Sequence, residues 1–94
     1  MTKKERAFIQ ETINLMSKYR EIADENFRFL QDKNREANGS AWCSAETNYK
    51  DLLLNHGKDY TSEFARYTEA TAMCDLLGKI GSGLADLEFW KEGR

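Results

Sequence analysis

The chain contains no proline, and its first glycine is Gly39. Proline and glycine are the residues that most often interrupt a helix, so a long stretch without either favours continuous helices. At ordinary frequencies a chain of 94 residues would contain about five prolines. A β-sandwich or β-barrel needs turn residues at intervals of roughly 8–12 positions. The sequence therefore predicts an all-α fold, and its length suits a single domain over residues 1–94.

The first predicted helix covers residues 3–38. Thr2 and Glu5 have the spacing of a capping box, which satisfies free N–H groups of the first turn. Apolar residues recur at intervals of seven in two adjacent rows: Phe8, Leu15, Ile22 and Phe29, and Ile9, Met16, Ala23 and Leu30. A double row indicates a helix that buries a broad face or forms a coiled-coil-like seam. This helix would be about 50 Å long, so it must either project or be covered by a long partner helix.

Two further helices are predicted, over residues 41–56 and 60–90. Gly39 and Gly57 follow the first and second helices, where glycine readily takes the left-handed conformation that ends a helix. Ser40 or Ser44 is expected to cap the second helix, whose apolar face comprises Trp42, Ala45, Tyr49, Leu52 and Leu53. The third helix carries two rows, one from Tyr60 through Phe64, Tyr67, Thr71 and Cys74, the other from Ala70 through Met73, Leu77 and Ile80. We expect a three-helix or coiled-coil-like bundle in which the two long helices pack antiparallel, with the short helix between them.

Three glycines, Gly78, Gly81 and Gly83, lie within six residues of the third helix. Their GxxGxG spacing and the absence of a preceding strand pattern differ from a phosphate-binding loop. We therefore interpret them as a hinge or as a place where another backbone packs closely. The apolar pattern keeps its phase across them, which favours a kinked but continuous helix. A break at 81–83 is the alternative.

No group of residues has the spacing of a catalytic or metal site. His56 is the only histidine, and its neighbours Asn55 and Gly57 offer no acidic or nucleophilic partner. Cys43 and Cys74 lack the closely spaced ligand pairs of zinc sites, and we expect reduced, partly buried thiols. The sequence therefore predicts a protein that is not an enzyme and that holds no catalytic residues, no cofactor and no metal.

The charge balance bears on the partners of the chain. Fourteen basic against sixteen acidic residues give a net charge of −2, which offers little to the phosphates of nucleic acid. No apolar stretch approaches the length of about 18 residues that a transmembrane helix needs, and no apolar signal core follows the N-terminus. We expect a cytoplasmic protein without a membrane partner. Its long apolar stripes suggest a core that is completed by self-association, as a homodimer, or by another protein.

The leading functional hypothesis is a non-enzymatic protein-binding module, a small inhibitor or adaptor acting by helix-face contact. The candidate contact residues are Phe8, Leu15 and Tyr19 in the first helix and Phe89 and Trp90 near the C-terminus. Aromatic side chains dominate interface hot spots, although Phe89 and Trp90 could instead fold back over the core. Small acidic helical proteins are common among the inhibitors and accessory proteins of phages and mobile elements, so by analogy of type alone we expect such an origin.

The alternative function is that of a nucleic-acid-binding accessory protein. It would use the basic residues of the first helix, which are Lys3, Lys4, Arg6, Lys18, Arg20 and Arg28. Acidic residues are interleaved with them and weaken the positive potential, so this hypothesis ranks second.

Overall fold

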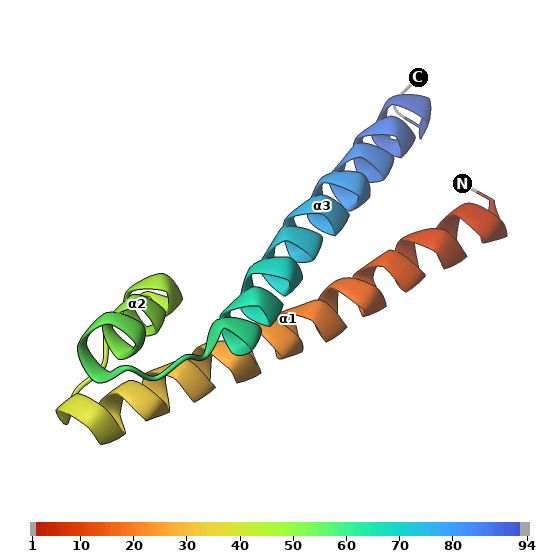
Figure 1. Cartoon of the computed structure of the whole chain (residues 1–94). Helices are drawn as coiled ribbons and strands as arrows, with labels where there is room; N and C mark the ends of the chain where they lie inside the picture. The colour runs from red at the N-terminus through yellow and green to blue at the C-terminus, as the bar shows by residue number, and fades with distance from the viewer. Residues whose placement is uncertain (1, 93–94) are drawn as a thin grey trace.

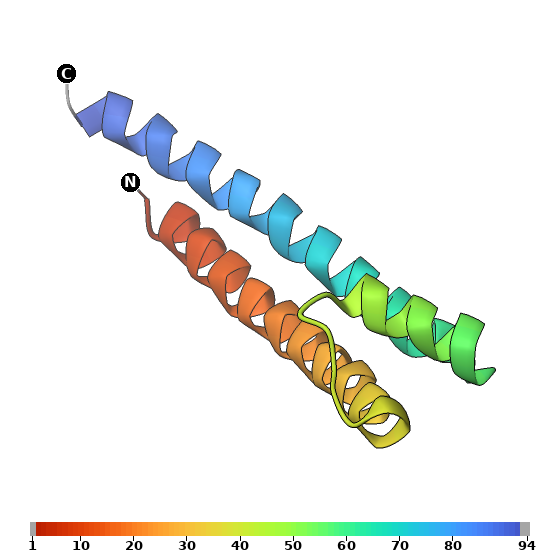
Figure 2. The same ribbon diagram turned by 90° about the vertical axis from the view of Figure 1, so that its left-hand side faces the viewer.

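The computed structural model describes the backbone of residues 2–92 and the side chains of residues 2–83. The described residues form three helices, α1 (Lys3–Asn38), α2 (Ala45–His56) and α3 (Thr61–Glu92), as Figure 1 shows. The described residues include no strand, and the predicted all-α fold is confirmed. The long helices α1 and α3 pack against each other and run antiparallel, so that both termini lie at one end (Figures 1 and 2).

The helix ends follow from local signals in the sequence. The Thr2 hydroxyl accepts a hydrogen bond from the N–H of Glu5 at 3.2 Å and begins α1. Gly39, with φ of 79°, ends α1, and its N–H donates to the carbonyl of Arg35 at 2.7 Å. Gly57 ends α2 in the same left-handed conformation, with φ of 63°. These positive φ angles explain why glycine follows each helix.

Helix α2 begins at Ala45, four residues later than the expected start at 41. Ser44 is the cap, and its hydroxyl accepts a hydrogen bond from the N–H of Thr47 at 3.3 Å. Trp42 therefore precedes the helix and is 56% exposed, and Leu53 also points outward. The prediction that Trp42 belongs to the apolar face of the second helix was wrong.

The core is concentrated at one end of the molecule, where α2 packs beside both long helices (Figure 2). We call this end, where the two interhelical connections lie, the closed end. Its fully buried centre is formed by Leu30, Ala45 and Leu52. Half-buried aromatic side chains surround that centre: Phe27, Phe29, Tyr49, Tyr60, Phe64 and Tyr67. Edge-to-face pairs link them, with ring centroids 4.6 Å apart for Tyr49 and Phe64, a favourable aromatic geometry.

Away from the closed end, the described part of the molecule is the α1–α3 pair, without a third helix packed beside it. The body measures 59 × 19 × 17 Å, and its radius of gyration is 18.2 Å. A compact domain of this length has a radius of gyration of only ~12–13 Å. Ala23, Ala70 and Leu77 continue the buried seam between α1 and α3 along this part. None of the helices, over the residues described, has the length and apolar character needed to cross a membrane.

Helix α3 continues through its three glycines without a break. A Cβ at Gly78 would lie 3.8 Å from the Met16 sulfur, which is an ordinary contact. A Cβ at Gly81 or Gly83 would meet nothing within 4 Å. Gly81 and Gly83 therefore make no close contact with other described residues of this chain, and the hinge or close packing expected at the three glycines stays a prediction.

Replacing Gly81 by alanine is expected to stabilise the protein by about 0.4–1 kcal/mol. Alanine fits the helical backbone and the open space at this position, and it lowers the entropy of the unfolded chain. Gly57→Ala is the matched control, because its φ of 63° strains any side chain and should make that variant less stable. Urea unfolding of the two variants measures both effects. A loss of stability in Gly81→Ala would contradict the open geometry.

Candidate functional site

The two apolar rows of α1 have different surroundings. The inner row faces α3, with Leu30 fully buried, Ala23 buried, and Ile9 and Met16 half-buried. The outer row faces away from the seam, and Phe8, Leu15 and Ile22 are 51, 40 and 39% exposed. The described part of the chain therefore covers mainly the inner row, because a single helix, α3, packs beside α1 along most of its length.

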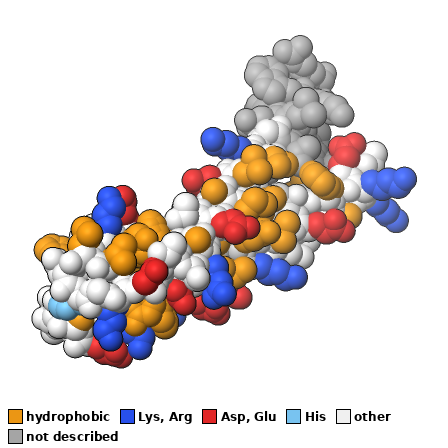
Figure 3. All heavy atoms as spheres, viewed as in Figure 1, with side chains coloured by type: hydrophobic (Ala, Val, Ile, Leu, Met, Phe, Trp, Pro, Cys, Tyr) orange, Lys and Arg blue, Asp and Glu red, His pale blue; other side chains and the backbone are white. Residues whose placement is uncertain are grey.

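The outer row borders a shallow groove between α1 and α3. The groove has a volume of about 220 Å³ and is lined by Tyr19 and Ile22 of α1 and by Arg66, Glu69 and Ala70 of α3. Leu76 follows Glu69 by seven residues and Ile80 follows Arg66 by fourteen, so both lie on the groove side of α3. Figure 3 shows hydrophobic side chains gathered along one face of the molecule.

We call the set of exposed apolar residues on the groove side of α1 and α3 the open face. It consists of Phe8, Leu15 and Ile22 of α1 and Leu76 and Ile80 of α3.

The predicted contact residues are only partly brought together. Phe8 and Leu15 belong to the open face, and Tyr19 lies half-buried in the groove beside it. The side chains of Phe89 and Trp90 lie outside the described residues. Sequence reasoning missed Leu76, and it placed Ile80 in a buried row although Ile80 is 38% exposed.

A buried polar network joins α1 to α2 at the closed end. The side-chain amide of Asn34 donates to Asn48 Oδ1 at 2.7 Å, and both residues are fully buried. The side chain of Asn48 also pairs with the backbone of Trp42, accepting from its N–H at 2.9 Å and donating to its carbonyl at 3.0 Å. These bonds hold Trp42 out of α2. Sequence reasoning missed the network, although Asn34 lies four residues beyond Leu30 on the buried side of α1 and was a visible signal.

The network extends to the surface through Asn38. Its side-chain amide donates to Asn34 and, at 2.9 Å, to Asp51 Oδ2, while its Oδ1 lies 2.7 Å from His56 Nε2. Asn55 donates to the other carboxylate oxygen of Asp51. Mainly because of the Asn55 hydrogen bond, the pKa of the Asp51 carboxyl lies below its ordinary value. His56 is the last residue of α2, as predicted from its place before Gly57.

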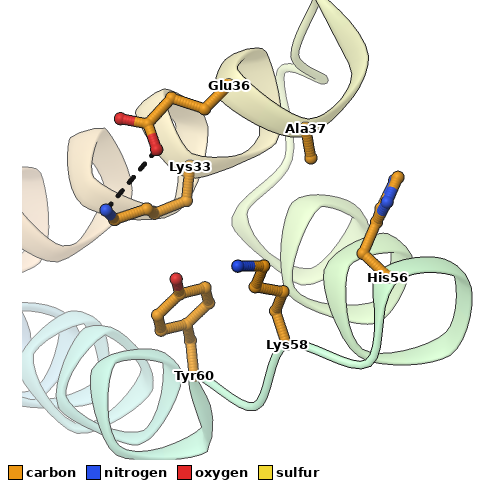
Figure 4. A pocket seen from close by; sticks show the side chains of 6 residues that line it. All are labelled: Lys33, Glu36, Ala37, His56, Lys58 and Tyr60. Carbon is orange, nitrogen blue, oxygen red and sulfur yellow. Dashed lines mark ion pairs between the residues drawn. The ribbon is translucent and has the colours of Figure 1, made fainter.

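A pocket of about 320 Å³ lies beside this network and is drawn in Figure 4. Its lining includes Lys33, Glu36, His56, Lys58 and Tyr60. The Lys33 ammonium is paired with Glu36 at 3.5 Å, and His56 is bonded to Asn38. The Lys58 ammonium points toward the side of the pocket formed by Lys33 and Tyr60 (Figure 4). Lys33 and Glu36 thus pair with each other and His56 with Asn38, which leaves Lys58 as an exposed charge at the pocket.

The two cysteines lie in separate parts of the molecule and are not bonded to each other. Cys43 is exposed in the connection between α1 and α2, which corrects the expectation that it is partly buried. Cys74 is half-buried in α3, and its thiol donates to the carbonyl of Met16 at 3.5 Å. Among the described residues, no group of three histidine, cysteine or acidic side chains is placed to hold a metal ion.

Comparison with known proteins gives no match. No protein-family model matches the chain, and neither a curated protein nor a solved structure is significantly similar to it.

The variant Asn48→Ala is expected to lower the free energy of unfolding by about 1–3 kcal/mol. It leaves the buried amide of Asn34 and the backbone N–H of Trp42 without their partner. Asn14→Ala, at an exposed position of α1, is the control and should change stability by less than about 0.5 kcal/mol. Urea unfolding gives both values. Equally small changes in the free energy of unfolding in both variants would show that the network does not contribute to stability.

The lowered pKa of Asp51 makes the stability of the folded protein depend on pH in the acidic range. A carboxyl whose pKa is lower in the folded state stabilises the protein above its unfolded pKa of about 3.9. That contribution is lost as the pH falls through the folded pKa. The variants Asp51→Asn and Asn55→Ala should therefore lose less stability between pH 5 and pH 2.5 than the wild-type chain. Urea midpoints at the two pH values test this, and an unchanged loss in both variants would contradict it.

Proposed function

We propose that this protein is a non-enzymatic protein-binding module, a small inhibitor or adaptor, that contacts its partner through the open face. The observation that carries the proposal is the exposure of five large apolar side chains, each between 38 and 51%, on one side of the α1–α3 pair. Several exposed apolar side chains on one side of a molecule, with charged residues around them, are typical of protein–protein contact sites. The groove beside it, lined in part by Tyr19, would admit an apolar side chain of the partner.

The exposed area of the chain supports the same proposal. A compact monomer of 10.9 kDa exposes about 5,600 Å². This chain exposes 6882 Å². An elongated body of 59 × 19 × 17 Å exposes more surface than a compact one of the same mass. Surface of that kind is stabilised when another chain covers it.

A nucleic-acid-binding role has less support. On α1 the basic residues share the helix with Glu5, Glu11 and Glu21, which are all exposed and weaken the positive potential around Lys4 and Arg20. The open face is apolar and offers no donors to phosphate. A cytoplasmic location and an origin in a phage or mobile element stay predictions of the sequence.

The experiment compares three immobilised forms of the protein with a lysate of the source cells that includes a tagged copy of this chain. The forms are the wild-type chain, Leu15→Lys on the open face, and Leu54→Lys as the control, since Leu54 is 77% exposed on α2. We expect the wild-type chain and Leu54→Lys to retain the same protein. Leu15→Lys should retain it at least about tenfold less, because a charge would be buried in the contact. The proposal fails if no protein is retained, or if all three forms retain the same proteins equally.

A further inference from the structure

We propose that the occupant of the open face is a second copy of this chain, bound antiparallel about a two-fold axis that passes between the two Leu15 side chains. This inference rests on the protein-binding role proposed above and names the partner. Three features support this dimer. They are the large exposed area of the chain, a row of alternating charges on α1, and the register of the exposed apolar residues on both long helices.

The area available matches what a dimer needs. The chain exposes about 1,300 Å² more than a compact monomer of its mass. A stable interface of standard size buries about 800 Å² on each partner. Covering the open face along the isolated part of α1 and α3 would therefore use surface that this chain has in excess.

Charged residues beside the outer apolar row alternate in sign at intervals of seven. Lys4, Glu11, Lys18 and Glu25 are all exposed and lie next to the outer row on the side away from α3. Within the described part of the chain, none of the four is in an ion pair. In an antiparallel pair of α1 helices, Lys4 lies opposite Glu25 of the second copy, and Glu11 lies opposite Lys18 of the second copy. A parallel pair in register would instead place each charge opposite its own sign.

The exposed part of the outer apolar row, from Phe8 to Ile22, has nearly the same centre as the charge row. The charges are symmetric about the midpoint between Glu11 and Lys18, which falls within one residue of Leu15. An axis at Leu15 places Phe8 opposite Ile22 of the second copy and Leu15 opposite itself. All three side chains are exposed in the single chain, so the pairing would bury them.

The exposed apolar residues of α3, Leu76 and Ile80, are centred at the same position along the helix pair as Leu15 of α1. The thiol of Cys74 contacts the Met16 carbonyl, and a Cβ at Gly78 would lie 3.8 Å from the Met16 sulfur. Gly78 is therefore level with Leu15 and Met16. A two-fold axis at this height places Leu76 of one copy opposite Ile80 of the other. One axis thus pairs the exposed apolar residues of both helices and the charges of α1, giving a four-helix arrangement of two hairpins.

The first measurement is the mass of the purified full chain in solution. Sedimentation equilibrium over a range of concentrations should give twice the chain mass of 10.9 kDa. Leu15→Lys places two like charges at the axis and should raise the dissociation constant at least about tenfold, whereas Leu54→Lys should leave it unchanged. Circular dichroism of each variant confirms that its helices are retained.

A cross-link tests the position of the axis. In a background of Cys43→Ser and Cys74→Ser, Leu15→Cys should form a disulfide between copies on mild oxidation, because the axis brings the two introduced thiols together. Ile13→Cys is the control. Ile13 is 44% exposed but lies on the opposite side of α1, and it should not cross-link under the same conditions.

Charge reversal tests the antiparallel register. Glu11→Lys or Lys18→Glu alone should weaken the dimer because each places like charges opposite one another. The double variant restores opposite charges across the axis and should recover the wild-type dissociation constant. These residues are exposed and seven positions apart, so they do not contact each other within one helix.

Three results would overturn the inference. The first is a monomer at every concentration, and the second is a dimer that cross-links through Ile13→Cys and not through Leu15→Cys. The third is a double variant that fails to recover the association lost in the single variants. If the purified chain is monomeric while Leu15→Lys still abolishes capture in the lysate experiment, the open face binds a different protein. The proposed function then stands without the second copy.

Discussion

A contact between only two helices covers about one row of side chains on each, and α1 carries two apolar rows. The inner row reaches full burial at Leu30, where α2 adds a third helix, whereas the outer row stays exposed from Phe8 to Ile22. The shape of the molecule, the position of its core and its exposed apolar surface all follow from this shortage of neighbouring helices. The open face is therefore a property of the architecture and does not depend on any single exposed residue.

The closed end combines apolar and polar contacts that have different roles. Leu30 and Leu52 provide the apolar burial, which attracts α2 but has little directional preference. The amides of Asn34 and Asn48 do have a direction, since each must find a hydrogen-bond partner inside the core. Their pairing sets where α2 lies along α1, and the bonds from Asn48 to Trp42 determine where α2 begins. The polar pair therefore positions a helix that apolar packing alone would hold less specifically.

The all-α fold class and most helix ends could be predicted from the sequence, because they depend on residues that lie close together along the chain. Thr2, Gly39 and Gly57 act within one turn of the ends that they set. The start of α2 was not predictable in this way, because the side chain of Asn48 takes the backbone groups of Trp42 from six residues away. Periodicity correctly grouped Phe8 and Leu15 on one side of a helix. It could not show that none of the described helices covers this side, because burial depends on how many helices the chain supplies.

The placement of the core at one end of a body 59 Å long gives the two ends different local stability. Backbone amides near Leu30 and Leu52 lie inside a three-helix core, so their hydrogen exchange requires unfolding of the whole chain. Amides in the first turns of α1 lie beside one helix at most, and they can open by separation of the two long helices alone. Protection from exchange should therefore decline along α1 from Leu30 toward Lys4, because three helices pack together only at the closed end.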